Sequence, residues 1–137
     1  MTGLSRSNGV PSAYGGDEEV RIGAVRALGD LRNGRAVDAL VDLLAHATGE
    51  FLYAVITNIC FLGDPRSCGA LLPFLDNPDR EVERRAIYAL GLVGDERTLE
   101  PLREKRRDKD RSIHSTADDA FYWVKQRLAA RKTPETE

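Results

Sequence analysis

Residue types that commonly carry out chemistry are scarce in this sequence. Its 137 residues include only two histidines and two cysteines. His46 and His114 stand far apart along the chain, and Cys60 and Cys68 have neither the spacing of a metal site nor that of a redox pair. We therefore expect no metal ion and no cofactor, and two cysteines that serve as small buried apolar residues in a reducing compartment.

A large net charge and long apolar runs are absent as well. The 20 basic and 22 acidic side chains nearly cancel, so the long-range electrostatic field is weak and binding to duplex nucleic acid is not expected. No apolar run approaches the roughly 20 residues of a membrane span, and the N-terminus lacks the pattern of a secretory signal. These features predict a cytoplasmic protein of one domain that does not enter the membrane.

What the sequence does contain is a repeat of 31 residues. The stretch 82–102 aligns without gaps to 51–71 and to 20–40, and its first half aligns again with 113–124. A fixed period of this size is typical of stacked helical pairs. It predicts an all-α fold, a right-handed α-α superhelix of seven helices. The expected organisation is a flexible N-terminal arm (1–16), a repeat domain (17–131) with repeats 17–47, 48–78 and 79–109 and a capping helix (110–131), and a disordered tail (132–137).

Apolar residues at helical spacing define the expected core. In the first helix they are Val20, Ala24, Ala27, Leu28 and Leu31. The later first helices and the capping helix repeat the pattern with Phe51, Val55, Asn58, Ile59 and Leu62, then Val82, Ala86, Ala89, Leu90 and Val93, and then Ile113, Ala117, Ala120, Phe121, Val124 and Leu128. Asn58 replaces an alanine of the other repeats, so its amide must find hydrogen bonds or lie at the edge of the interface.

The segment 89–102 has the sequence Ala-Leu-Gly-Leu-Val-Gly-Asp-Glu-Arg-Thr-Leu-Glu-Pro-Leu. Together with Leu62-Gly63-Asp64-Pro65-Arg66 and Ala27-Leu28-Gly29, it resembles the short HEAT-like repeat first associated with phycobilisome lyases. The resemblance covers roughly residues 18–124 and implies a HEAT-like solenoid. Members of this family include bilin-attachment proteins, whereas most occurrences look like adaptor or scaffold modules.

The same resemblance implies a structural ladder of acidic and basic residues that joins adjacent repeats. The matching positions, at the start of each second helix, are Arg35, Asp64, Arg66, Asp95 and Arg97. Asn33 stands where the first repeat would carry the acid. Partly exposed ion pairs contribute only about 0.2–1 kcal/mol each, so the ladder is expected to set the register of the repeats more than their stability.

Catalytic constellations are not evident in the sequence. His114 has Asp118 one helical turn away and Ser112 and Ser115 nearby, which are a base, an orienting acid and hydroxyl groups. Neighbours on one exposed helical turn rarely enclose a substrate, so this set is interpreted as a solvated helix surface. We predict that the protein is not an enzyme and has no catalytic residues.

Two surfaces are candidate binding sites. On the outer face of the first helices and the capping helix, a contiguous apolar row is expected to mark an interface unless repeat packing or the arm covers it. The predicted outer row consists of Tyr53, Phe61, Tyr88, Leu92 and Trp123. On the second helices, a concave acidic groove is expected to suit a basic peptide, or else to be a solvated charged face. The predicted groove consists of Asp38, Asp42, Pro73, Glu100 and Glu104.

The function predicted from these features is that of a non-enzymatic scaffold or adaptor that binds a protein or peptide, with self-association through the outer row as an open possibility. Two alternatives remain. The family resemblance allows a bilin-lyase-like subunit for chromophore attachment. The segment 103–111, with six basic and three acidic residues, allows a helical-repeat module that binds nucleic acid.

Overall fold

The computed structural model of the protein describes residues 15–31 and 33–132. Residues 1–14 of the predicted arm and residues 133–137 of the predicted tail lie outside this part. The helices are α1 (Gly15–Leu31), α2 (Gly34–Leu44), α3 (Gly49–Leu62), α4 (Cys68–Leu71), α5 (Arg80–Val93), α6 (Leu99–Lys105) and α7 (Arg111–Lys132), with short 3₁₀ helices η1 (Pro65–Ser67), η2 (Leu72–Asp76) and η3 (Glu96–Thr98). Every regular element of the described residues is helical, so the predicted all-α repeat solenoid is confirmed.

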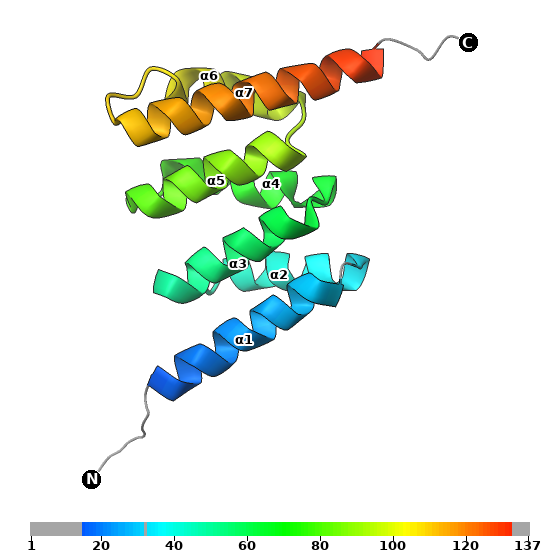
Figure 1. The fold of residues 1–137 in the computed structure, drawn as a ribbon, viewed down its shortest axis with the longest axis vertical. Coiled ribbons are helices and arrows are strands. Elements are labelled where there is room, and N and C mark those ends of the chain that lie inside the picture. The colour runs from blue at the N-terminus through cyan, green and yellow to red at the C-terminus, as the bar shows by residue number, and fades with distance from the viewer. Residues whose placement is uncertain (1–14, 32, 133–137) are drawn as a thin grey trace.

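The helices form two layers along the long axis of the molecule. Figure 1 shows α1, α3, α5 and α7 stacked in one layer, with α2, α4 and α6 in a second layer behind them. Each helix of the first layer packs against the next one, and α5 and α7 have the most extensive contact. The blue helix α1 therefore lies at one end of the stack and the red helix α7 at the other (Figure 1). None of the helices in the described part of the chain has the length and apolar content of a membrane span.

Short polar side chains begin the helices. Asn33 Oδ1 accepts a hydrogen bond from the backbone N–H of Ala36 at 2.9 Å. Asp64, Asp79 and Asp95 each accept the backbone N–H two residues further along the chain, also at 2.9 Å. These bonds satisfy N–H groups that have no partner within the first helical turn. These caps therefore set where α2, η1, α5 and η3 begin.

The cap carboxylates predict a loss of stability in acid. Side-chain hydrogen bonds, the largest cause in each case, hold the pKa of Asp64, Asp79 and Asp95 below the usual range. Because the unfolded chain then takes up protons at a higher pH than the folded chain, this contribution is complete at neutral pH and is lost as the pH falls below about 4. Urea denaturation between about pH 7 and pH 3 should show this decrease, and Asp→Asn substitution at all three positions should flatten it. A wild-type free energy of unfolding that does not change over this range would contradict the prediction.

The second helix of repeats two and three is not a regular α-helix. In repeat two it runs through η1, α4 and η2, with Pro65 at the first position of η1. Pro73 has no N–H to donate to a carbonyl in the preceding turn, and from Leu72 the chain tightens into 3₁₀ geometry. In a 3₁₀ helix, residues three apart lie on the same side, so Leu72 and Leu75 point in a common direction.

The predicted core is present in repeats two and three and in the capping helix. The buried residues that the period predicts are Phe51, Val55, Ile59, Val82, Ala86, Ala89, Leu90, Val93, Ile113, Ala117, Ala120, Phe121, Val124 and Leu128. Leu62 and Asn58 are half-buried. The Asn58 side-chain amide donates to the carbonyl of Ala54 at 2.8 Å. The side chain has room because Gly29 has no Cβ; a Cβ there would overlap the Asn58 amide. The amide thus finds a hydrogen bond, as its position required.

The predicted core stripe of the first helix is wrong for four of its five residues, whereas Leu28 is half-buried and packs on the core. Val20 and Leu31 are 70% and 60% exposed, Ala24 and Ala27 are exposed as well, and the buried residue is Val25 on the side facing α3. The reason is the place of α1 at the end of the stack. In α3 the equivalent stripe packs against the preceding first helix, whereas no helix of the described residues precedes α1.

Candidate functional site

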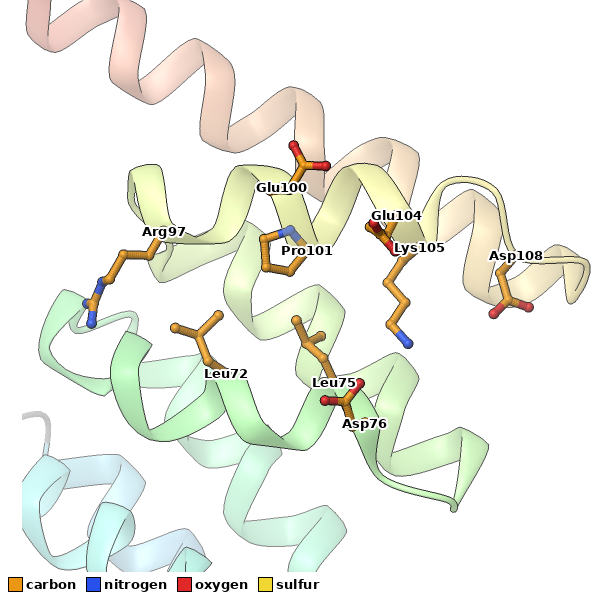
Figure 2. Close-up of a pocket in the computed structure, with 9 residues that line it drawn as sticks. All are labelled: Leu72, Leu75, Asp76, Arg97, Glu100, Pro101, Glu104, Lys105 and Asp108. Carbon is orange, nitrogen blue, oxygen red and sulfur yellow. The ribbon is translucent and has the colours of Figure 1, made fainter.

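A groove lies between η2 and α6. Its volume is about 700 Å³. The residues that line it are Leu72, Leu75, Asp76, Arg97, Glu100, Pro101, Glu104, Lys105 and Asp108. Figure 2 shows these side chains on the two facing segments, with the groove open between them.

Apolar side chains form the middle of the groove. Leu72 and Leu75 rise from η2 toward Pro101 on α6 (Figure 2). Leu75 is buried, whereas Leu72 and Pro101 are half-buried and can contact a ligand. The 3₁₀ geometry of η2 places both leucines on this wall. The centre of the groove can therefore accept an apolar side chain.

Both basic groups of the groove are held by acids of the protein itself. Lys105 Nζ lies 2.6 Å from Oε2 of Glu83, a carboxylate of α5 whose side chain is only 5% exposed. Arg97 Nη2 lies 3.1 Å from Asp95 Oδ2. Because these cations already have partners, they do little to neutralise a further carboxylate.

The four acidic groups of the groove differ in this respect. Two have cationic partners, Asp108 with Arg80 at 3.1 Å and Glu100 with Arg103 at 2.6 Å. Asp76 on η2 and Glu104 on α6 are exposed and form no ion pair with any described residue. The groove thus presents one unneutralised carboxylate on each side of an apolar centre.

The structure brings together only part of the predicted concave groove. Glu100 and Glu104 line it, whereas Asp38, Asp42 and Pro73 are exposed on the second helices but do not line it. The prediction missed the apolar residues Leu72 and Pro101, and it also missed Asp76, Arg97, Lys105 and Asp108. Leu72 could not be predicted as a groove residue because the chain tightens into 3₁₀ geometry at η2, which puts Leu72 and Leu75 on the same side.

The predicted ladder has its shortest ion pairs inside repeats two and three and longer contacts that reach the neighbouring repeat. Arg66 Nη2 lies 3.0 Å from Asp64 Oδ2, and the Arg97–Asp95 pair has the same geometry at 3.1 Å. Contacts between repeats are longer: Arg66 Nη1 lies 3.8 Å from Asp38 Oδ1, and Cys68 Sγ lies 3.9 Å from Asp95 Oδ1. Arg35 is exposed and forms no ion pair with the described residues, in keeping with Asn33 beside it.

The five residues of the predicted outer row divide into two groups. Phe61, Tyr88 and Leu92 are exposed, at 62%, 44% and 38%. Tyr53 and Trp123 are half-buried. The Tyr53 hydroxyl donates to Asp79 Oδ2 at 2.7 Å, and the Trp123 ring packs edge-on against Tyr88 with ring centroids 5.5 Å apart.

A cleft of about 390 Å³ lies beside the exposed members of this row, between α3 and α5. Phe61, Tyr88 and Leu92 line it together with Thr57, Cys60, Arg84 and Arg85. Burial raises the pKa of the Cys60 thiol to about 11, so the thiol stays protonated at neutral pH. Cys60 therefore contributes apolar surface to this cleft rather than a nucleophile.

Half of the basic side chains of the segment 103–111 are paired with acids of the protein. Three of its cations form ion pairs, Arg103 with Glu100 (2.6 Å), Lys105 with Glu83 (2.6 Å) and Arg106 with Asp118 (2.7 Å). His114 Nδ1 lies 2.6 Å from the carbonyl oxygen of Arg106, and its Nε2 lies 3.5 Å from Asp118. These side chains hold the loop before α7 in place, whereas Arg107, Lys109 and Arg111 of the same segment are exposed.

A stack of helical pairs with a groove along its second helices defines a helical-repeat scaffold. The family model for HEAT repeats matches residues 45–121, and that for the PBS lyase HEAT-like repeat matches residues 20–46. The first match spans more than half of the chain, which belongs to the HEAT repeat family. A search of curated proteins finds no match to this chain.

Proposed function

We propose that the chain is a non-enzymatic scaffold that binds an extended basic segment of a partner protein in the groove between η2 and α6. One observation carries the proposal: Asp76 and Glu104 present unneutralised carboxylates on the two sides of an apolar centre. HEAT repeats generally mediate protein interactions, which agrees with a binding role.

Charge and shape together select the ligand. A Lys or Arg side chain of the ligand would gain an ion pair with Asp76 or Glu104, and an apolar side chain beside it would cover Leu72 and Pro101. Because the groove holds only a few side chains, the interface is small, and the affinity is expected to be on the order of micromolar.

Binding can be measured by fluorescence polarisation with labelled peptides of about 12 residues. The probe is a peptide of alternating lysine and leucine, and the two comparison peptides replace lysine by glutamate or leucine by serine. We expect the lysine-leucine peptide to bind most tightly and to weaken as salt is added, because its ion pairs lie near solvent. Equal binding of all three peptides would reject the proposal.

Charge reversal in the groove tests the location. Asp76→Lys with Glu104→Lys is expected to weaken binding of the lysine-leucine peptide at least about tenfold, because attraction becomes repulsion at both sides. The matched control, Asp38→Lys with Asp42→Lys, makes the same change of net charge on second-helix residues outside the groove. An equal loss in both variants would show that net charge, rather than the groove, recognises the peptide. Thermal melting followed by circular dichroism verifies that each variant is folded.

A further inference from the structure

The end of the stack at α1 carries an uncovered apolar stripe. Val20, Ala24, Ala27 and Leu31 are exposed, and their spacing of four, three and four residues places them on one side of the helix. At about 1.5 Å per residue, the stripe is on the order of 17 Å long. It lies opposite the side of α1 that packs on α3.

This stripe has the chemistry of a surface that packs against a helix. The equivalent positions of α3 include Phe51, Val55 and Leu62, which belong to or pack on the core where α3 meets α1. Small residues occupy the middle of the α1 stripe, and small residues let two helix axes approach to about 8 Å. A helix therefore matches the stripe better than an extended segment does.

The opposite end of the stack does not offer a matching surface. Ile56 of α3 and Ile87 of α5 are buried on the side of their helices that faces the next repeat. The equivalent residue of α7 is Asp118, which is paired with Arg106 at 2.7 Å. Stacking the α1 end of one copy on the α7 end of another would bury this charged pair, which carries a desolvation cost. Head-to-tail growth of copies is thereby disfavoured.

We propose that a second copy of this chain covers the stripe, with the two α1 helices packed antiparallel about a two-fold axis. The order of the stripe, large, small, small and large, is unchanged when it is reversed. In the antiparallel arrangement Val20 meets Leu31 of the second copy, and Ala24 meets its Ala27. A two-fold contact uses the same surface on both copies, so assembly stops at the dimer.

The predicted dimer is weak. A single pair of helices buries less than the roughly 1,200 Å² at which stable interfaces begin. Association should therefore depend on concentration, with monomers at low micromolar and dimers at higher concentration.

Sedimentation velocity of the full chain from about 1 to about 500 μM measures this equilibrium. We expect a shift from monomer to dimer across that range, and Ala24→Glu should reduce the association constant at least about tenfold because it places two charges in the centre of the contact. The matched control is Ala130→Glu, at an exposed position of α7, which should leave association unchanged. A wild-type chain that stays monomeric throughout, or equal association of wild type and Ala24→Glu, overturns the proposal.

Disulfide trapping tests the orientation. When Ala24→Cys protein is mixed with Ala27→Cys protein, a 24–27 disulfide should form between copies. The yield of disulfide-linked dimer should be at least about threefold higher in the mixture than for either variant alone, and mass spectrometry identifies the linked positions. Preferential 24–24 and 27–27 linkage would indicate parallel helices and overturn the two-fold antiparallel model.

If residues 1–14 cover the stripe instead, the wild type stays monomeric, and replacing Leu4, Val10 and Tyr14 by serine in the full chain induces association. That result would assign the stripe to the arm and reject the dimer.

Discussion

Replacing Gly91 with alanine is expected to lower the free energy of unfolding by about 2–3 kcal/mol, because α5 and α7 approach too closely at this point for a side chain. A Cβ at Gly91 would lie 2.7 Å from Trp123 Cε3 and 2.8 Å from both Cα and Cβ of Ala120. Because the Ala120 Cα belongs to the backbone, the whole of α7 would have to shift to make room for the new methyl group. The free-energy cost of this shift exceeds the gain of about 1 kcal/mol that alanine has over glycine in helix propensity. Urea denaturation followed by the fluorescence of Trp123, the single tryptophan, measures the effect directly.

Gly23 provides the matched control. It lies inside α1, and a Cβ there would meet no atom within 4 Å. Gly23→Ala should therefore stabilise the protein by up to about 1 kcal/mol through reduced freedom of the unfolded chain. If Gly91→Ala also stabilises the protein, the close approach of α5 and α7 is not a constraint, and the packing described at Trp123 is wrong.

The same contact explains why Trp123 could not be assigned from the sequence. The 31-residue period correctly places residues 61, 92 and 123 at equivalent positions of successive helices. It does not reveal that Gly91 leaves room for the Trp123 ring to settle between α5 and α7. Exposure of a repeated position depends on which side chains the neighbouring helix presents, and that information lies in another repeat.

Periodicity predicted the helices and most of the core, and its errors are at the ends of the pattern and at prolines. The stripe of α1 has the residue types of a buried surface, but burial also needs a neighbouring helix, which no local pattern can supply. In the second helix of repeat two, Pro73 alters the helix type and so the direction of Leu72. The acids Glu100 and Glu104 could be predicted because they lie on the α-helical part, α6, of the second helix of repeat three.

Replacing Glu83 with glutamine is expected to cost about 2 kcal/mol of stability, because this buried carboxylate joins α5 to α6. Its two oxygens accept from Arg80 Nη1 at 2.8 Å and from Lys105 Nζ at 2.6 Å. Removing the charge leaves the Lys105 ammonium, whose side chain is only 21% exposed, without its counterion. The estimate is below the 3–5 kcal/mol typical of a fully buried pair because Arg80 is 54% exposed and can turn to water.

Glu81, two residues earlier on α5, is the control for this substitution. It also accepts from two cations, Arg84 and Arg85, each at 2.6 Å, but all three side chains are about one-third exposed. Glu81→Gln should therefore cost less than about 1 kcal/mol in the same urea titration. Equal effects at the two positions would mean that burial does not distinguish them.

The repeat itself supplies a substitution that should restore stability. By the 31-residue offset, Glu83 and Lys105 of repeat three correspond to Leu52 and Phe74 of repeat two, which belong to or pack on the apolar core. A double variant, Glu83→Leu with Lys105→Phe, replaces the buried ion pair by the apolar pair that the neighbouring repeat already uses. Because a well-packed apolar pair is often at least as stable as the buried ion pair it replaces, the double variant should lie within about 1 kcal/mol of the wild type. Glu83→Leu alone should be less stable than the double variant, since Lys105 would then face a leucine. If the double variant is as unstable as that single one, the two repeats do not share equivalent packing at these positions.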